Sequence, residues 1–215
     1  MHRMLLEKTG RACWMSHLDF MRLMQRAFRR AGVLLHHSQG YTPHAYVSML
    51  LPLSVGMESQ CEIMEYETDG ELLPTRESMN AVLPEGVRVL DIYESDRKAK
   101  ELAFLRAVLT LEYDAGVPET AVKEIASLLS EPSLTVEKRT KRGMEETDIR
   151  PLLKHCEITQ ENTALSLLCT VSAQDPPLNP MLLAAAIERY LPHLRPNYVK
   201  CRRIELLDAA GEAFR

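Results

Sequence analysis

The sequence predicts an α+β protein built from two tandem ferredoxin-like βαββαβ units with antiparallel sheets. The same order of expected elements (strand, helix, strand, strand, helix, strand) occurs twice along the 215 residues, and this order is the split-βαβ arrangement. A charged stretch without apolar periodicity, residues 96–101, separates the two sets. We therefore predict an N-terminal half at 1–95, a linker at 96–101 and a C-terminal half at 102–215.

An amphipathic helix is the best-defined element of the first half. Ser16 is a suitable N-cap with Asp19 three residues later, and Gly32 is a suitable end. Apolar residues recur between them at helical spacing and predict the buried face: Phe20, Leu23, Met24, Ala27 and Ala31. We expect the other elements to be strands at 3–8, 33–37, 61–68 and 87–93 and a helix at 75–82, with 46–53 extended. The alternation at 61–68 predicts a strand with one covered face.

The second half is expected to repeat this order. Proline at 118 opens its first helix, and Asn179 caps its second, with Pro180 at the first position. Residues 149–158 are predicted as a poorly defined connection. We expect the elements to be strands at 106–113, 134–140, 165–171 and 199–207 and helices at 118–129 and 180–191.

The composition is that of a globular cytoplasmic protein. Hydrophobic residues make up 46% and charged residues 26% of the chain, which is ordinary for a folded domain. No stretch approaches the roughly 18 consecutive apolar residues of a membrane span, and the N-terminus lacks the pattern of a signal peptide. We predict no membrane partner.

The five cysteines are widely scattered and odd in number. They lack the tight spacing that holds zinc or an iron–sulfur cluster. We interpret them as small buried hydrophobic residues in a reducing compartment. We accordingly predict that this chain binds no metal and no cofactor.

Positive charge is concentrated near the N-terminus. The chain has a net charge of −4, yet residues 1–60 contain seven Lys and Arg against three Asp and Glu. An asymmetry of this kind indicates an anionic partner for that segment, although solubility alone also produces it.

A long run of unusual residues between Lys8 and Ser59 resembles a known family. The run includes Lys8, Gly10, Ala12 and Met15 to Asp19, and then Arg26 to Ala31, Ser38 to Pro43 and Pro52 to Ser59. A second part of the resemblance consists of two short segments, 138–141 and 148–151. These positions are similar to the motifs of an uncharacterised domain family that is fused to, or encoded beside, cobalamin-dependent radical-SAM proteins.

The resemblance implies a partner rather than a reaction. The chain lacks the three closely spaced cysteines that hold the cluster of a radical-SAM enzyme. The resemblance therefore favours a stand-alone accessory domain over an enzyme, and it places any radical chemistry on a radical-SAM partner chain.

Four arginines of the first helix are candidate phosphate ligands. Guanidinium groups match phosphate oxygens, and these residues fall mostly opposite the apolar stripe. The same arrangement also suits the solvated side of an ordinary amphipathic helix. The four are Arg22, Arg26, Arg29 and Arg30.

Histidines and a turn-rich loop supply the remaining candidates of the first half. His17 and Asp19 are a candidate acid–base pair, although a capping or buried role suits them better. His36, His37 and His44 match no familiar metal-ligand spacing. The loop at 38–44 presents Ser38, Gln39, Tyr41 and His44 either to a ligand or simply to a turn.

Basic residues of the second half are candidate RNA ligands: Lys138, Arg139, Lys141 and Arg150. The strand expected at 199–207 also carries basic residues. The two groups form one positive stripe if the strands that carry them are neighbours in the sheet. Nearby carboxylates otherwise neutralise them.

Three functions stay open at this point. The first is an accessory or substrate-recognition protein of a radical-SAM partner, with RNA as the leading ligand through the basic surfaces. The second is a phosphate-handling enzyme, a nuclease or transferase, that uses His17 and Asp19. The third is a plain protein–protein adaptor.

Overall fold

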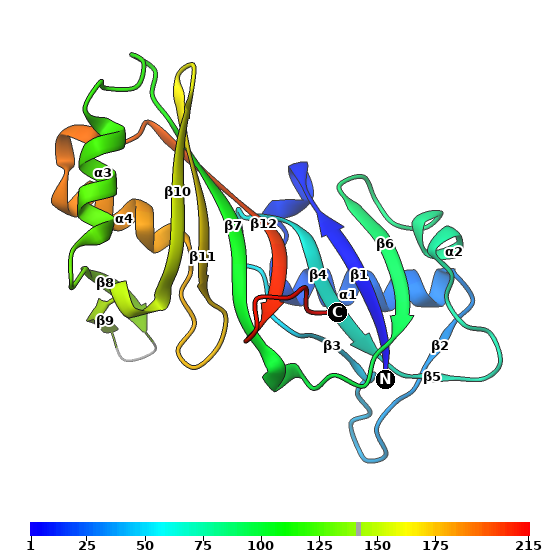
Figure 1. Cartoon of the computed structure of the whole chain (residues 1–215). Helices are drawn as coiled ribbons and strands as arrows, with labels where there is room; N and C mark the ends of the chain where they lie inside the picture. Colours follow the sequence, from blue (N-terminus) through cyan, green and yellow to red (C-terminus); the bar gives the residue numbers. More distant parts are fainter. Residues whose placement is uncertain (141–142) are drawn as a thin grey trace. The chain divides into compact units, whose positions relative to one another are not determined.

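The computed structural model describes residues 1–140 and 143–215, the side chains of 139 and 140 excepted. The chain forms two compact units (Figure 1). Unit 1 comprises Met1–Glu101 together with Arg215, and unit 2 comprises Leu102–Phe214. The predicted linker, 96–101, clusters with unit 1, where Ser95 Oγ donates to the Arg215 carbonyl over 3.1 Å.

Unit 1 has one long helix, one short helix and a small antiparallel sheet. The helices are α1 (His17–Arg30) and α2 (Arg76–Asn80), with 3₁₀ turns η1 (Gly10–Trp14) and η2 (Ala99–Glu101). The strands are β1 (His2–Lys8), β2 (Leu34–Leu35), β3 (Val47–Met49), β4 (Glu58–Tyr66), β5 (Thr68–Asp69) and β6 (Val87–Glu94).

The main sheet of unit 1 has the order β6-β1-β4-β3, and every pair is antiparallel. This order is compatible with a ferredoxin-like unit, and the predicted α+β class is confirmed. The predicted strand at 33–37 is wrong in extent, because only β2 is extended and it pairs with β5 outside this sheet. The predicted one-sided strand at 61–68 is also wrong, since Ile63 and Met64 are both buried although they lie on opposite faces of β4.

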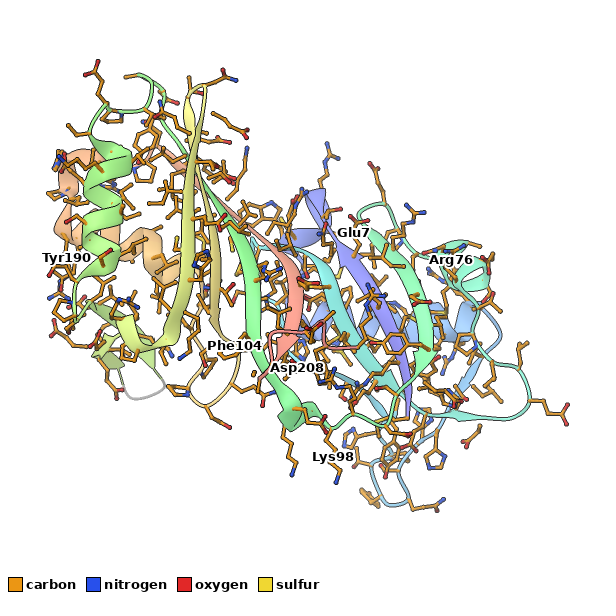
Figure 2. All side chains as sticks on the ribbon, viewed as in Figure 1. Glu7, Arg76, Lys98, Phe104, Tyr190 and Asp208 are labelled. Atoms are coloured by element: carbon orange, nitrogen blue, oxygen red, sulfur yellow. The ribbon has the colours of Figure 1, made fainter. Side chains whose placement is uncertain are left out.

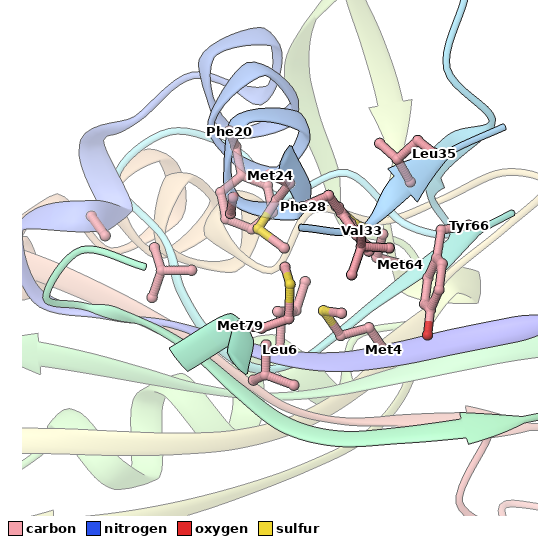
Figure 3. Close-up of a cluster of buried hydrophobic side chains, with 14 residues drawn as sticks. Met4, Leu6, Phe20, Met24, Phe28, Val33, Leu35, Met64, Tyr66 and Met79 are labelled. Carbon is pink, nitrogen blue, oxygen red and sulfur yellow. The ribbon is translucent and has the colours of Figure 1, made fainter. Parts of the chain in front are cut away.

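The core of unit 1 lies between α1 and the sheet (Figure 3). Phe20, Met24 and Phe28 project from successive turns of α1 and are at most 3% exposed. They face Met4 of β1 and Met64 of β4. Burying side chains of this size stabilises a fold by about 1.5–3 kcal/mol each, so this contact fixes how α1 is rotated about its axis.

A buried ion pair ties β1 to β4 on the other side of the sheet. Arg3 is fully buried, and its Nε and Nη2 donate to Oε1 of Glu65 over 3.1 and 2.7 Å. Arg3 Nη1 donates to Ser95 Oγ over 3.0 Å. Arg3 and Glu65 are also register partners, so the backbone pairing places the two charges side by side.

Unit 2 repeats the element order and adds a hairpin. Its helices are α3 (Ala121–Ser130) and α4 (Met181–Tyr190), with 3₁₀ turns η3 (Arg150–Leu152) and η4 (Pro192–Leu194). Its strands are β7 (Leu102–Glu112), β8 (Thr135–Thr140), β9 (Gly143–Asp148), β10 (Leu153–Glu161), β11 (Ala164–Ser172) and β12 (Tyr198–Asp208).

The main sheet of unit 2 has the antiparallel order β10-β11-β7-β12. In chain order, β10 is the second strand of this sheet. We predicted that 134–140 would form the second strand and that 149–158 would be a connection. Both predictions are wrong. Most side chains of β10 are exposed, which leaves no apolar alternation for the sequence to show. The first helix begins at Ala121 rather than at 118, because Pro118 supplies only the carbonyl that accepts from the Ala121 N–H.

Residues 134–140 belong instead to the hairpin β8–β9, which is separate from the main sheet. The hairpin is fastened to α4 by Tyr190, labelled in Figure 2, whose hydroxyl donates to the Thr135 carbonyl over 3.0 Å. Arg189 pairs with Glu146 over 2.8 Å.

Within the described parts of the chain, no helix combines the length and apolarity needed to cross a bilayer.

Replacing the buried arginine, Arg3→Met, is expected to lower the free energy of unfolding by about 3 kcal/mol, because Glu65 then keeps its charge without its main partner. The matched control is Arg76→Met, since Arg76 is mostly exposed and its pair with Glu77 spans 3.5 Å; this change should cost under about 1 kcal/mol. Chemical denaturation of both variants measures the difference. Equal losses would contradict the importance given to the Arg3–Glu65 pair.

Candidate anion-binding site

A pocket of about 500 Å³ lies beside the outer face of α1. One wall consists of polar residues of the helix, and the other consists of the β2 segment with Ala45 and Asp69. The lining residues are Arg22, Gln25, Arg26, Arg29, Val33, Leu34, Leu35, His37, Ala45 and Asp69. The structure therefore brings together three of the four predicted helix arginines.

The position of these arginines follows from the burial of the opposite side of α1. Residues 22, 26 and 29 are spaced by four and three positions, so they form one row along a helix. The helix starts at Ser16, whose Oγ accepts from the Asp19 N–H over 3.2 Å, as predicted. Its last residue is Arg30, and the predicted stop, Gly32, follows with φ +80°, a conformation that favours glycine.

The pocket has an excess of positive charge. Arg22 pairs with Asp19 over 3.1 Å, while both side chains stay more than half exposed. The guanidinium groups of Arg26 and Arg29 are exposed and have no hydrogen-bond or ion-pair partner among the described residues. Asp69 is the one acidic residue among the lining residues. Partnerless guanidinium groups around a concave surface are suited to phosphate or carboxylate oxygens.

One histidine, His37, lines the wall opposite α1, and the neighbouring His36 contacts a lining residue. Nδ1 of His37 lies 2.8 Å from the Leu35 carbonyl oxygen and donates to it, because a carbonyl oxygen only accepts. Nδ1 of His36 lies 2.7 Å from Oδ1 of Asp69. The side-chain contact between His36, which follows β2, and Asp69 of β5 lies beside the pocket.

The predicted loop at 38–44 rises from the edge of the pocket. His37 and Ala45, which both line the pocket, form an isolated β-bridge at the base of the loop. Ser38 stabilises the loop internally, because its Oγ accepts from the His44 N–H over 3.0 Å. Gln39 and Tyr41 are exposed, and Tyr41 is fully exposed.

His17 and Asp19, the predicted acid–base pair, do not meet. Residues two positions apart on a helix do not face each other, and no hydrogen bond joins these two side chains among the described residues. The Ser16 hydroxyl donates to Asp19 over 2.7 Å. This hydrogen bond, followed by that from Arg22, lowers the pKa of Asp19, as suits a helix-capping carboxylate. Arg30 is exposed but does not line the pocket.

Several family-motif residues have a structural explanation. Lys8 is only 2% exposed, and its Nζ donates to the Met15 carbonyl over 2.7 Å, which holds the entry into α1. Gly56 has φ +85°, and a Cβ there would lie 3.3 Å from the ring of Trp14. Ser59 is fully buried, and its Oγ accepts from the Cys61 N–H.

The basic residues of unit 2 do not form the proposed stripe. Lys138 is on β8, whose partner is β9, whereas the basic residues at 200–203 are on β12, whose partner is β7. Lys138 lies opposite Glu145 in register. Arg150 Nη1 donates to the Leu153 carbonyl over 3.0 Å. Lys141 and the side chain of Arg139 lie outside the described residues.

The cysteines have the predicted buried setting, with Cys156 half-buried and the other four buried. Burial raises the pKa of Cys156 to about 11 and that of Cys201 to about 12, so both are thiols at neutral pH. Among the described residues, no group of three or more His, Cys, Asp or Glu is placed to hold a metal ion.

The pocket contains residues that the sequence did not single out: Gln25, Leu34 and Asp69. The helical spacing of Gln25 from Arg22 and Arg29 was a usable signal. Leu34 and Asp69 reach the pocket through the two-residue pairing of β2 with β5, which is too short to leave a periodic pattern.

Together, fold and pocket define an α+β protein of two antiparallel units with a basic pocket on unit 1. A family described as "Uncharacterized protein conserved in bacteria (DUF2344)" matches residues 2–180. Because this match covers most of the chain, the chain belongs to that family. The description names no radical-SAM protein, so that link stays a proposal. No curated protein matches the chain.

Two solved structures are similar in fold. One is a chain in a crystal structure of a Cbf5-Nop10-Gar1 complex, with a TM-score of 0.55 and 10% identity over 95% of this chain and 48% of that chain. The other, from an archaeal box H/ACA sRNP Nop10-Cbf5 complex, has a TM-score of 0.47 and 12% identity over 94% and 46%. This chain spans about half the length of both. At 10% identity the first match shows the fold alone, and nothing is argued from the second.

Removing the helix cap, Ser16→Ala, is expected to lower the free energy of unfolding by about 1 kcal/mol, because the Asp19 N–H loses its acceptor. Ser127→Ala is the matched control, since Ser127 is exposed on α3 and alanine favours a helix there. Thermal and urea unfolding measure both changes. The capping role is wrong if the two variants are equally stable.

Proposed function

We propose that this protein is an accessory, substrate-recognition protein of a cobalamin-type radical-SAM partner and that it binds RNA through the pocket beside α1. The observation that carries the RNA proposal is the row of Arg22, Arg26 and Arg29 along one 500 Å³ pocket. Arg26 and Arg29 have no hydrogen bond or ion pair among the described residues, so none has to be broken before they bind an anion; Arg26 only attracts Asp19 through space.

The spread of the row favours a polyanion over a single phosphate. Residues 22 and 29 are seven positions apart, which places them about 10 Å apart along the helix axis at 1.5 Å per residue. Three charges over this length suit successive phosphates of a nucleic-acid strand. Such a strand also gains from counterion release, which supplies much of the affinity of nucleic-acid binders.

The partner proposal is supported by the sequence motifs rather than by the pocket. The resemblance at Lys8–Ser59 and at 138–151 points to the radical-SAM-associated family. Because the chain lacks that enzyme's cysteine motif, the role proposed for it is to hold the substrate. No cofactor is proposed for this chain.

The double variant Arg26→Ala/Arg29→Ala is expected to weaken binding of total cellular RNA by about tenfold or more, because hydrogen bonds to charged groups contribute about 1.5–3 kcal/mol each. The dependence of log affinity on log salt should become shallower by about 1.4, since each phosphate contact on a single strand contributes about 0.7. Fluorescence anisotropy between about 50 and 200 mM salt measures both quantities.

Arg30→Ala is the matched control for this experiment. Arg30 has the same charge and lies on the same helix, but it does not line the pocket. The RNA proposal is wrong if the wild-type protein binds no RNA, or if the control and the double variant weaken binding equally.

A protein–protein adaptor is a second candidate, favoured by exposed apolar side chains near the start of α1. Trp14 is 64% exposed and Leu18 is 65% exposed. The phosphate-handling enzyme has less support, because His17 and Asp19 do not meet.

Co-purification from the native host tests the adaptor and the radical-SAM partner together. We expect a radical-SAM protein to be recovered with the wild-type chain and to be lost with Trp14→Ala/Leu18→Ala. The control is Leu72→Ala/Leu73→Ala, which removes two exposed apolar side chains elsewhere on unit 1. If no partner is recovered, both the adaptor proposal and the radical-SAM partner proposal are wrong. RNA binding is tested separately.

A further inference from the structure

We infer that the pocket and the loop at 38–44 bind unpaired nucleotides, so that the protein selects single-stranded RNA over duplex RNA. This inference rests on the proposed function and adds the form of RNA that the site accepts. Three features of unit 1 lead to it: the apolar wall of the pocket, the fully exposed Tyr41 and the position of the loop.

The pocket offers an apolar surface directly beside the arginines. Leu34 is 66% exposed and lines the pocket together with Leu35 and Ala45. A pocket of about 500 Å³ falls in the range that encloses a small organic molecule. A nucleobase is flat and largely apolar on its faces, so it can cover Leu34 while its phosphate meets Arg26 or Arg29. A base held in a double helix cannot enter such a pocket.

The loop supplies an aromatic ring at the rim. Tyr41 is fully exposed, with no hydrogen bond or ring contact among the described residues. It is four residues from each side of the bridge between His37 and Ala45, so it lies within about 14 Å of the pocket wall along an extended chain. The hydrogen bonds between Ser38 and His44 close the base of this loop, which holds its tip outside the sheet (Figure 1).

A single strand can contact the arginines, the apolar wall and Tyr41, whereas a duplex can contact only the arginines. Unpaired bases stack on aromatic side chains regardless of sequence. In double-stranded RNA the base faces are covered, and the major groove is too narrow for side chains to read. A duplex would therefore meet only the arginines, through its phosphates.

Anisotropy titrations with one labelled oligoribonucleotide, free and annealed to its complement, test the inference. We expect the single strand to bind the wild-type protein at least tenfold more tightly than the duplex. Tyr41→Ala should weaken single-strand binding at least about fivefold, in line with the loss of one stacked base, and should leave duplex binding unchanged. Tyr41→Phe should bind like the wild type, because phenylalanine keeps the ring.

Tyr198→Ala is the control, since Tyr198 is a half-exposed tyrosine of unit 2. Circular dichroism should show all variants folded, because Tyr41 buries no surface. Equal affinity for single strand and duplex, or normal binding by Tyr41→Ala, overturns this inference and leaves the proposed function standing. Absence of binding to either form overturns both.

Discussion

The packing of α1 on the sheet of unit 1 is the contact on which the candidate site depends. Phe20, Met24 and Phe28 are almost fully buried, and this fixes the rotation of the helix about its axis. Arg22, Arg26 and Arg29 are then directed to the opposite side, toward the β2 segment. The apolar face of α1 therefore fixes the position of the helix beside the pocket. The arginines on its opposite face give the pocket its positive charge.

The sequence predicted those parts of the fold that leave a periodic signal. The α1 helix, its Ser16 cap and its Gly32 end have the predicted places, and both sheets have the expected antiparallel character. The second strand of unit 2 was misplaced because β10 is exposed along most of its length and therefore lacks apolar alternation. The strand β8 was predicted but assigned to the main sheet, and its partner β9 was not predicted, because an insertion into a repeated unit has no counterpart in the first unit.

The candidate site was predictable in part, for a related reason. Helical spacing places the arginines on one face from sequence alone, yet the same rule separates His17 from Asp19, two positions apart, and so removes the predicted pair. Asp69 comes from a stretch 40 residues beyond Arg29 and joins the site through the β2–β5 contact. Contacts between distant short segments leave no trace in one sequence.

Basic residues of unit 1 differ in whether their charge is buried and paired within the protein or exposed to a ligand. Membership of the family motifs does not make this distinction. Arg3 and Lys8 are basic residues like Arg26, but both are buried and donate to named protein acceptors. A buried cation in that position costs free energy unless the protein itself satisfies it, so its charge is committed to the fold. Arg26 and Arg29 are exposed, line a concave surface and have no hydrogen-bond or ion-pair partner among the described residues. Their charge is therefore the charge that remains available for a ligand, and the Lys8–Ser59 block combines both kinds within one motif.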